Sequence, residues 1–198
     1  MKITLPDNST RELPEGSSGY DLAKDIGPGL AKSAVAVIVD GEQKDLHDVI
    51  EGDSLISIIT IDSDNGLEIM RHTLTAQVLA SALKNIYPNA RLAIGPTIDD
   101  GFYYDVESEV SISIDDLQKI ENEMKKIIST KSNITKKLSN KKDSLKVFKN
   151  LDEPYKEAII NESDQEENFQ LYYQDNDIFV DLCNCLLYTS DAADELRS

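Results

Sequence analysis

Apolar residues in the first sixty positions occur in short runs that have the length of strands and are separated by turn signals. Four such runs predict strands, because they are rich in branched side chains and are bounded by turn-forming residues. A segment with helical spacing, residues 20–26, follows Ser17-Ser18, which can cap a helix, and Gly27-Pro28-Gly29 ends it. The predicted strands are residues 3–5, 11–13, 34–39 and 55–61. The order strand, strand, helix, strand, turn, strand predicts a small α+β unit at residues 1–61, typical of a β-grasp fold.

A long helical pattern follows the polar segment 62–66. That segment predicts a short linker, and its acidic side chains can also cap the next helix, where negative charge complements the helix dipole. From about Leu67 to Tyr87, apolar residues recur at helical spacing and form one stripe. The stripe consists of Leu67, Met70, Leu74, Val78, Ala82 and Ile86, widened by Leu79 and Leu83. Pro88 predicts the end of this helix, because proline cannot continue the hydrogen-bond ladder.

The segment from Ala90 to Val106 predicts a hairpin rich in aromatic residues. Gly95-Pro96 forces a turn, because the residue before a proline is pushed out of the helical region. Asp100-Gly101 is a two-residue hairpin signal, since glycine tolerates a positive φ. Residues 102–104, which are Phe-Tyr-Tyr, then predict a strand. From the pattern alone, this segment is a well-made hairpin in a core.

Helices and strands alternate through the rest of the chain. Ser113-Ile114-Asp115-Asp116 is a capping box, and the apolar residues after it predict a second amphipathic helix from Leu117 to Ile128. Proline near the first turn favours a further helix from Pro154. The other predicted elements are strand contacts at Ile134 and Leu138, a short helix at 144–150, and paired strands at 169–173 and 178–182. The whole chain is therefore expected to be α+β.

Charge is distributed unevenly along a chain whose formal net charge is −17. Bulk charge therefore excludes non-specific binding to nucleic acid. However, nine lysines lie between Lys125 and Lys149, where Asp143 is the only acid. This segment is either an edge that contacts phosphates or a solvated helix with its following loop. The sequence leaves both interpretations open.

Neither a membrane span nor a signal peptide is predicted. No apolar run approaches the roughly 20 residues that a bilayer requires, so a cytoplasmic protein without membrane association is expected. Cys183 and Cys185 lie too close in sequence for an unstrained disulfide. No set of four metal ligands is evident, because only His47 and His72 could join the two cysteines. No bound metal is therefore predicted.

The first unit resembles the TGS domain in its short sequence motifs. Ile-Thr-Leu-Pro-Asp, Leu-Ala-Lys-Ser-Ala, Val-Asp-Gly, Asp-Leu and Ile-Ile-Thr occur in the order of that domain. TGS domains lie at the N-terminus of threonyl-tRNA synthetases and also occur in some GTPases and in stringent-response alarmone enzymes. The unit has no phosphate-binding loop and no nucleophile–base pair, so it is expected to be a binding or positioning module.

Residues 66–184 resemble the editing domain of threonyl-tRNA synthetases. The shared landmarks are a helix ending in Tyr-Pro, Ile-Gly-Pro-x-Ile-x-x-Gly-Phe-Tyr-Tyr-Asp, an Asp-Asp-Leu helix, Glu-Pro-Tyr-Lys and Phe-Val-Asp-Leu-Cys. In that family the domain hydrolyses serine wrongly attached to threonine tRNA. The resemblance implies catalytic roles for Lys156, Asp181 and Cys183 in an editing-type pocket.

The histidine pair of that family is not matched. A His-x-x-x-His spacing places both rings on one helix face. Here Gln77 lies five residues after His72, which is about 140° around an α-helix, so the two do not share a face. A gapless alignment from Tyr87-Pro88 puts Thr73 and Gln77 at the two histidine positions, and a helix is expected to absorb an inserted residue poorly. Thr73, Gln77 and His72 are thus candidate substrate-binding residues, although a lone His72 beside an apolar stripe is more often structural.

The last residues depart from the family pattern, which ends in Cys-x-x-x-His. Residues 185–198 resemble a translated sequencing adapter, so this tail is expected to be non-native; an acidic disordered tail describes it equally well. The resemblance implies that a class II aminoacylation core, with its ATP, Mg and Zn sites and its homodimer contacts, lies outside this chain. Threonine tRNA is the expected partner. The alternatives are a stand-alone hydrolase of mischarged tRNA and a non-enzymatic TGS regulatory module.

Overall fold

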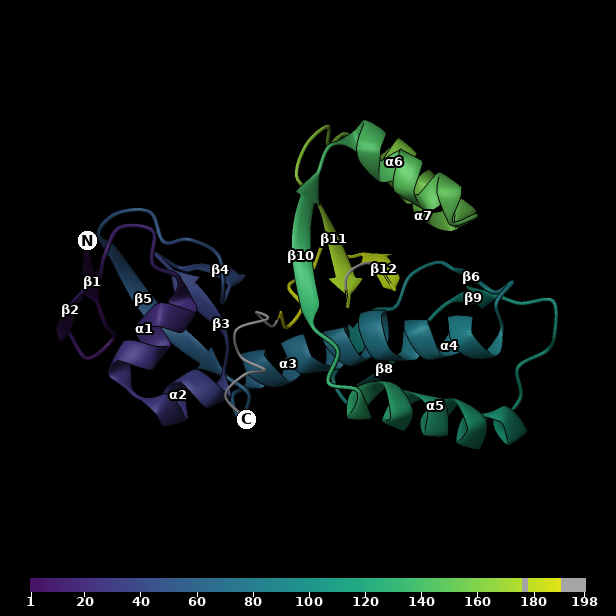
Figure 1. Ribbon diagram of the computed structural model, residues 1–198, viewed down its shortest axis with the longest axis horizontal. Helices are drawn as coiled ribbons and strands as arrows, with labels where there is room; N and C mark the ends of the chain where they lie inside the picture. The colour runs from purple at the N-terminus through teal and green to yellow at the C-terminus, as the bar shows by residue number, and fades with distance from the viewer. Residues whose placement is uncertain (176–177, 190–198) are drawn as a thin grey trace. The chain divides into compact units, whose positions relative to one another are not determined.

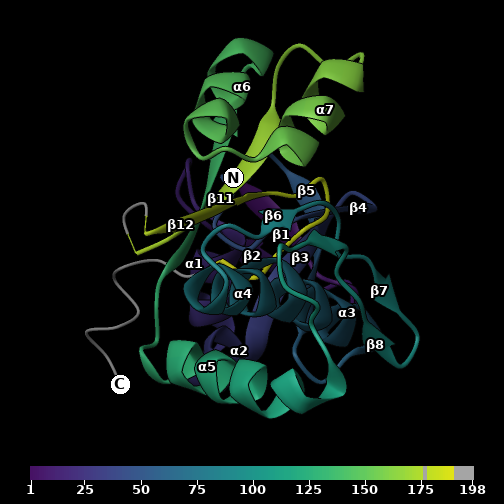
Figure 2. The same cartoon turned by 90° about the vertical axis from the view of Figure 1, so that its right-hand side faces the viewer.

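The computed structural model describes residues 1–175 and 178–189 of the 198-residue chain. It forms two compact units: residues 1–70 together with residues 186–189, and residues 71–185. Both units contain helices and sheets, which confirms the expected α+β class. Figures 1 and 2 show the elements of each unit from two directions. None of the helices in the described ranges has the length and apolar character that a membrane span requires.

The first unit has a mixed five-stranded sheet with the strand order β2-β1-β5-β3-β4. Strand β1 runs parallel to β5, and the other pairings are antiparallel. Its elements are β1 (Lys2–Thr4), β2 (Thr10–Glu12), α1 (Gly19–Ile26), α2 (Pro28–Ser33), β3 (Ala34–Val39), β4 (Glu42–Asp45) and β5 (Ser54–Thr60). This topology confirms the predicted β-grasp fold. Strand β4 was not predicted, because Glu-Gln-Lys-Asp shows no alternation of apolar residues.

Strand β3 is buried on both of its faces, which explains its uninterrupted Ala-Val-Ala-Val-Ile-Val sequence. Val37 and Val39 pack into one core with Leu22 of α1 and Ile56 of β5. Val35 belongs to a second cluster with Ile59 and Ile69, against which Leu186 and Tyr188 pack. Thr189 is also buried, and its hydroxyl donates a hydrogen bond to Asp45 at 2.7 Å. Residues 186–189 are therefore packed against this unit.

Segment 62–66 leads directly into helix α3 (Asp64–Thr73), which begins inside it. Ser63 donates its hydroxyl to the carbonyl of Thr60 at 2.7 Å, and its oxygen accepts the backbone N–H of Gly66 at 3.1 Å. A Cβ at Gly66 would lie 2.0 Å from the Thr60 carbonyl oxygen, so only glycine fits there. The structure thus supports the capping interpretation.

The second unit combines a helical layer with a three-stranded antiparallel sheet of order β10-β11-β12. The capping box is confirmed, since the Ser113 N–H donates to Asp116 at 2.9 Å. Helix α3 continues through a π-helix, η1 (Leu74–Leu79), into α4 (Ala80–Ile86). The other helical elements are the 3₁₀ turn η2 (Ile114–Asp116), α5 (Leu117–Ser129), α6 (Lys141–Asn150) and α7 (Pro154–Glu162). The strands are β6 (Arg91–Leu92), β7 (Thr97–Ile98), β8 (Gly101–Phe102), β9 (Val106–Glu107), β10 (Ile134–Ser139), β11 (Phe169–Gln174) and β12 (Phe179–Leu182).

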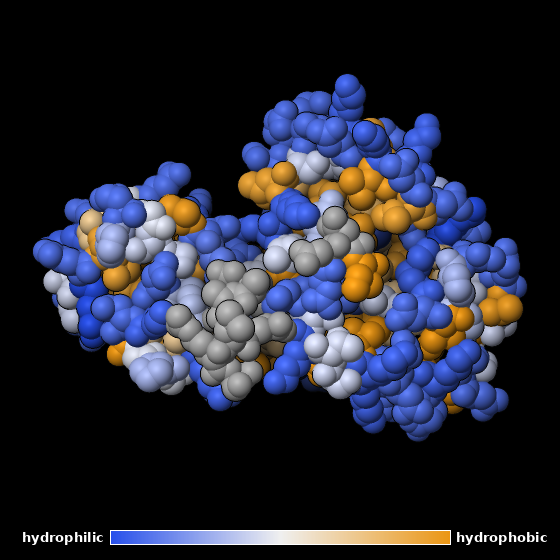
Figure 3. Space-filling view, in the orientation of Figure 1, coloured by the Kyte–Doolittle hydropathy of each residue, from blue (hydrophilic) through white to orange (hydrophobic). Residues whose placement is uncertain are grey.

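Two clusters of apolar residues hold this second unit together. Helix α4 packs on α5 and on strand β6 through Ala80, Leu83, Leu92 and Ile120. Helices α6 and α7 pack on the sheet through Phe148, Ile160, Phe169, Leu171 and Leu182. Hydrophilic residues cover the outer side of α5 and α6 in the view of Figure 3. The amphipathic pattern of α5 therefore has its polar face toward solvent.

The lysine-rich segment is divided among the end of α5, strand β10 and helix α6. Several of its lysines contact groups of the same unit. The ammonium of Lys137 lies 4.1 Å from the centre of the Tyr173 ring, and Lys141 donates to the Ser163 carbonyl at 2.7 Å. Through these contacts, the lysine-bearing surface supports the sheet and the α6–α7 pair. They are compatible with both interpretations of the segment.

Candidate functional site

A cavity of about 240 Å³ in the second unit brings together residues from four parts of the sequence. Helix α3 contributes His72 and the π-helix η1 contributes Ala76, while α7 contributes Lys156 and Ile159. The hairpin segment contributes Ile94, Gly95, Pro96 and Tyr104, and the end of β12 with the residues after it contributes Asp181, Leu182, Cys183, Asn184 and Cys185. This cavity is lined by all three residues for which the resemblance implies catalytic roles, Lys156, Asp181 and Cys183.

A buried ion pair forms the inner wall of the cavity. The ammonium of Lys156 lies 2.6 Å from one carboxylate oxygen of Asp181, and the two side chains are only 4% and 3% exposed. The Tyr104 hydroxyl donates to the other oxygen of Asp181 at 3.0 Å and accepts a hydrogen bond from Lys156 at 3.2 Å. Each polar group in this triad is thus satisfied, which is the condition under which a buried charge pair is tolerated.

Tyr104 stays protonated in this setting. Burial raises the pKa of its hydroxyl well above the usual range, and the negative charge of Asp181 raises it further. The hydroxyl is therefore a stable hydrogen-bond donor to Asp181. Sequence reasoning placed Tyr104 in the hairpin but assigned it no role. The Gly-Phe-Tyr-Tyr-Asp motif was the signal that could have pointed to it.

Gly95 allows the Tyr104 ring to approach the hairpin backbone. A Cβ at Gly95 would lie 2.5 Å from a ring carbon of Tyr104 and 2.7 Å from the methyl group of Thr75. Such contacts are far shorter than van der Waals distance, so a larger residue would displace the ring. The glycine of Ile-Gly-Pro is therefore needed for close packing around the triad.

The π-helix η1 changes how the helix presents its side chains. In this stretch the backbone hydrogen bonds run from i to i+5, which inserts one extra residue into the turn. The expectation that a helix absorbs an added residue poorly does not hold here, because the π-helix accommodates it. As a result His72 and Ala76, spaced i to i+4, both line the cavity.

Thr73 and Gln77, the other candidate binding residues, lie in the interior and not on the cavity wall. Their exposed fractions are 4% and 0%. The Gln77 side-chain amide donates to the Tyr172 carbonyl at 3.4 Å, and its backbone carbonyl accepts from Gln174 at 2.8 Å. Gln77 thus ties the helix to strand β11. The gapless alignment placed these two residues in the pocket because it assumed a regular α-helix.

His72, Cys183 and Cys185 form a cluster at the cavity. One side-chain nitrogen or sulfur atom from each lies within 4.8 Å of the others. Hydrogen bonds to Cys183 and then to His72 lower the pKa of the Cys185 thiol to about 4, whereas the hydrogen bond with Cys185 and burial raise the pKa of Cys183. Sequence reasoning missed this cluster, since spacing along the chain gives no sign that His72 meets the two cysteines.

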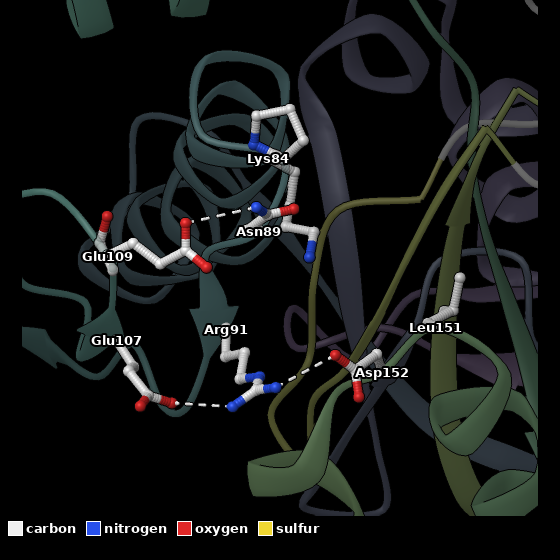
Figure 4. Close-up of a pocket in the computed structure, with 9 residues that line it drawn as sticks. Lys84, Asn89, Arg91, Glu107, Glu109, Leu151 and Asp152 are labelled. Atoms are coloured by element: carbon white, nitrogen blue, oxygen red, sulfur yellow. Dashed lines mark hydrogen bonds and ion pairs between the residues drawn. The ribbon is translucent and has the colours of Figure 1, made fainter.

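A second cavity, of about 460 Å³, is lined by charged residues that pair with one another. Figure 4 shows Arg91 between Glu107 and Asp152, at 3.6 and 3.2 Å. Asn89 donates to Glu109 at 3.4 Å on the other side of the same cavity. These are exposed pairs of the kind that contribute little stability. None of the candidate site residues lies here, so the first cavity is the candidate site.

Comparisons with known proteins agree with this architecture. A family profile described as the TGS domain matches residues 1–60. Over 183 residues, or 92% of the chain, the sequence is 42% identical to a threonine–tRNA ligase of Acetivibrio thermocellus. It is 40% identical over 185 residues to the threonine–tRNA ligase of Halalkalibacterium halodurans, and 43% identical over 184 residues to that of Paramagnetospirillum magneticum.

The chain spans 28% of the length of each of these relatives. It is therefore similar to a part of threonine–tRNA ligases, and the TGS domain matched at residues 1–60 lies within that part. The resemblance seen in the sequence is thus confirmed.

Proposed function

We propose that this chain is the N-terminal part of a class II threonine–tRNA ligase, which attaches threonine to its tRNA in the cytoplasm with the use of ATP. The similarity of about 40% over 92% of the chain supports this proposal. ATP, Mg and Zn would then be bound by a core outside these residues, and the homodimer would form through that core. The two units described here would contact threonine tRNA and would not aminoacylate by themselves.

The reading frame at the genomic locus tests this proposal. We expect it to continue past Asn184 into a class II synthetase core, because residues 185–198 depart from the family pattern. Long-read sequencing of the locus is the measurement. A stop codon near Ser198 would contradict the proposal and would favour a stand-alone hydrolase of mischarged tRNA.

We further propose that the cavity in the second unit is an editing-type pocket with weak hydrolytic activity. The observation that carries this is the meeting of His72, Lys156, Asp181 and Cys183 in one cavity. Hydrolysis of an aminoacyl ester needs a water that is held and activated at the carbonyl carbon. Lys156 and Asp181 neutralise each other at 2.6 Å, which suits them to hold a polar substrate and leaves proton transfer to an imidazole.

Among the residues that the structure describes, only one histidine lines this pocket, so hydrolysis of seryl-tRNA should be slow. General base assistance typically contributes about 10²–10⁴ in rate, and a lone imidazole has no second ring to position the water. The assay measures serine released from mischarged threonine tRNA by the full-length enzyme restored from its locus. Rapid tRNA-dependent release that survives blocking of the aminoacylation site would refute the prediction.

Two matched variants make this test specific. Ala76→His places a second imidazole four residues from His72 on the cavity wall, so it should accelerate serine release. Gln77→His is the control, because Gln77 is fully buried and faces strand β11. An acceleration by Gln77→His and not by Ala76→His would show that the regular-helix alignment, and not the π-helix geometry, describes the pocket.

A further inference from the structure

We propose that the outer face of helix α6 binds the phosphate backbone of threonine tRNA, an inference that rests on the proposed function. This face carries Lys142, Lys146 and Lys149, and all three residues are exposed. Positions i, i+4 and i+7 of an α-helix lie within an arc of about 60°, so the three side chains leave the helix on one side and span about 10 Å along its axis. We refer to these three side chains as the α6 lysine face.

The opposite side of α6 fixes the helix on the sheet. Ser144 and Phe148 are buried, and Phe148 packs against Phe169 of strand β11. At the start of the helix, the Asn140 side-chain oxygen accepts the backbone N–H of Asp143 at 2.8 Å, and the Asn140 amide donates to the Asp143 carboxylate at 2.8 Å. The only acid of α6 is therefore engaged in the helix cap, and the lysine face rests on a well-anchored support.

The lysines of this face differ from those of α5, which have carboxylate partners. Lys125 lies 2.6 Å from Glu121, and Lys126 lies 3.3 Å from Glu123. Within the part of the chain that the structure describes, no carboxylate lies within 4.0 Å of an ammonium of the α6 lysine face. The chain has 37 acidic residues, so this absence of ion pairs is not a shortage of carboxylates. Three unpaired positive charges on one helix face suit an anionic partner.

The formal net charge of −17 does not prevent binding at this face. At physiological ionic strength, charges farther apart than about 8 Å are largely screened, whereas a phosphate in contact with an ammonium is not. Residues 125–149 contain nine lysines and a single acid, so the surroundings of α6 are locally positive. The acidic remainder of the chain disfavours phosphate contacts elsewhere, which directs an RNA backbone to α6.

The side chains of the face are suited to contacts with phosphates and not to reading bases. Lysine presents a point charge on a flexible stem, whereas arginine forms the planar, bidentate contacts that recognise bases. Residues 125–149 contain no arginine, and the only aromatic residue of α6, Phe148, is buried. Phosphate contacts fix the position of a nucleic acid without selecting its sequence. We therefore expect the face to bind a tRNA for another amino acid as it binds threonine tRNA.

The experiment measures the fluorescence anisotropy of labelled threonine tRNA during titration with the 198-residue chain at several salt concentrations. The test variant combines Lys142→Gln, Lys146→Gln and Lys149→Gln. Loss of three phosphate contacts should reduce the slope of log affinity against log salt by about 2.1–2.7. Between about 50 and about 200 mM salt, the unchanged chain should therefore lose about 20–40-fold more affinity than the variant.

A matched control removes the same charge from α5, which lies on the other side of the same unit (Figures 1 and 2). It combines Lys119→Gln, Lys125→Gln and Lys126→Gln, whose ammonium groups contact an aromatic ring and two carboxylates of their own unit. This control should reduce the salt slope by less than about 1, since these lysines already have partners. All six lysines are exposed, so both variants should fold, and circular dichroism verifies this.

Equal reductions of the salt slope in the two triple variants would overturn the proposal, because bulk charge would then explain binding. Binding of polyglutamate but not of tRNA by the unchanged chain would also overturn it, since the partner would be an acidic protein. A reduction confined to threonine tRNA and absent with another tRNA would contradict backbone contacts. None of the three lysines lines the candidate cavity, so serine release by the restored enzyme tests the proposed function independently of this face.

Discussion

Replacing Asp181 with alanine should lower the free energy of unfolding of the second unit by about 3–5 kcal/mol, the cost of removing one partner from a buried ion pair. The change leaves the Lys156 ammonium, whose side chain is 4% exposed, without its carboxylate partner at 2.6 Å. It also removes the acceptor of the Tyr104 hydroxyl. Urea denaturation followed by far-ultraviolet circular dichroism measures the change.

The double variant Lys156→Met with Asp181→Ala provides the control for this prediction. It removes both charges, so it should be more stable than Asp181→Ala alone, because no uncompensated charge remains in the interior. If the single and double variants lost the same stability, the pair would contribute through packing and not through charge. A loss below about 1 kcal/mol for Asp181→Ala would show that water reaches Lys156.

Local signals accounted for much of the fold. Turn residues and apolar runs gave the order of most elements along the first unit, because each element carries its own local signal. The parallel pairing of β1 with β5, which sets Ile3 beside Ser54, is not local. The capping box at Ser113 was also predictable, since Ser113 and Asp116 contact each other within one turn. In contrast, β4 carries mostly exposed polar residues and pairs at the edge of the sheet, so its pattern contained nothing to distinguish it from a turn.

The candidate site was only partly predictable, because its geometry depends on one irregular turn and on contacts between distant residues. Reading the helix at 3.6 residues per turn put Thr73 and Gln77 in the pocket, and the π-helix puts His72 and Ala76 there instead. Tyr104 meets Asp181 across 77 positions of sequence. No periodicity encodes such a contact, so resemblance identified Lys156 and Asp181, and only the structure added Tyr104.

Glu153 lies one helical turn before Lys156, at the start of α7. Glu153 is 6% exposed, and its two carboxylate oxygens have different partners. One lies 2.7 Å from the Lys84 ammonium of α4, and the other accepts the backbone N–H of Leu92 at 2.9 Å. This single carboxylate therefore joins α4, β6 and α7.

Replacing Glu153 with alanine should destabilise the second unit by about 2–4 kcal/mol, because it leaves the buried N–H of Leu92 without an acceptor and Lys84 without its ion pair. Glu153→Gln keeps an acceptor of the same shape and should lose about half as much. The matched control is Glu107→Ala, which removes the exposed ion pair with Arg91 and an exposed hydrogen bond from Tyr155, and should change stability by less than about 1 kcal/mol. Urea denaturation of the three variants measures these differences. Equal losses for Glu153→Ala and Glu107→Ala would show that the carboxylate of Glu153 does not hold α7 in place.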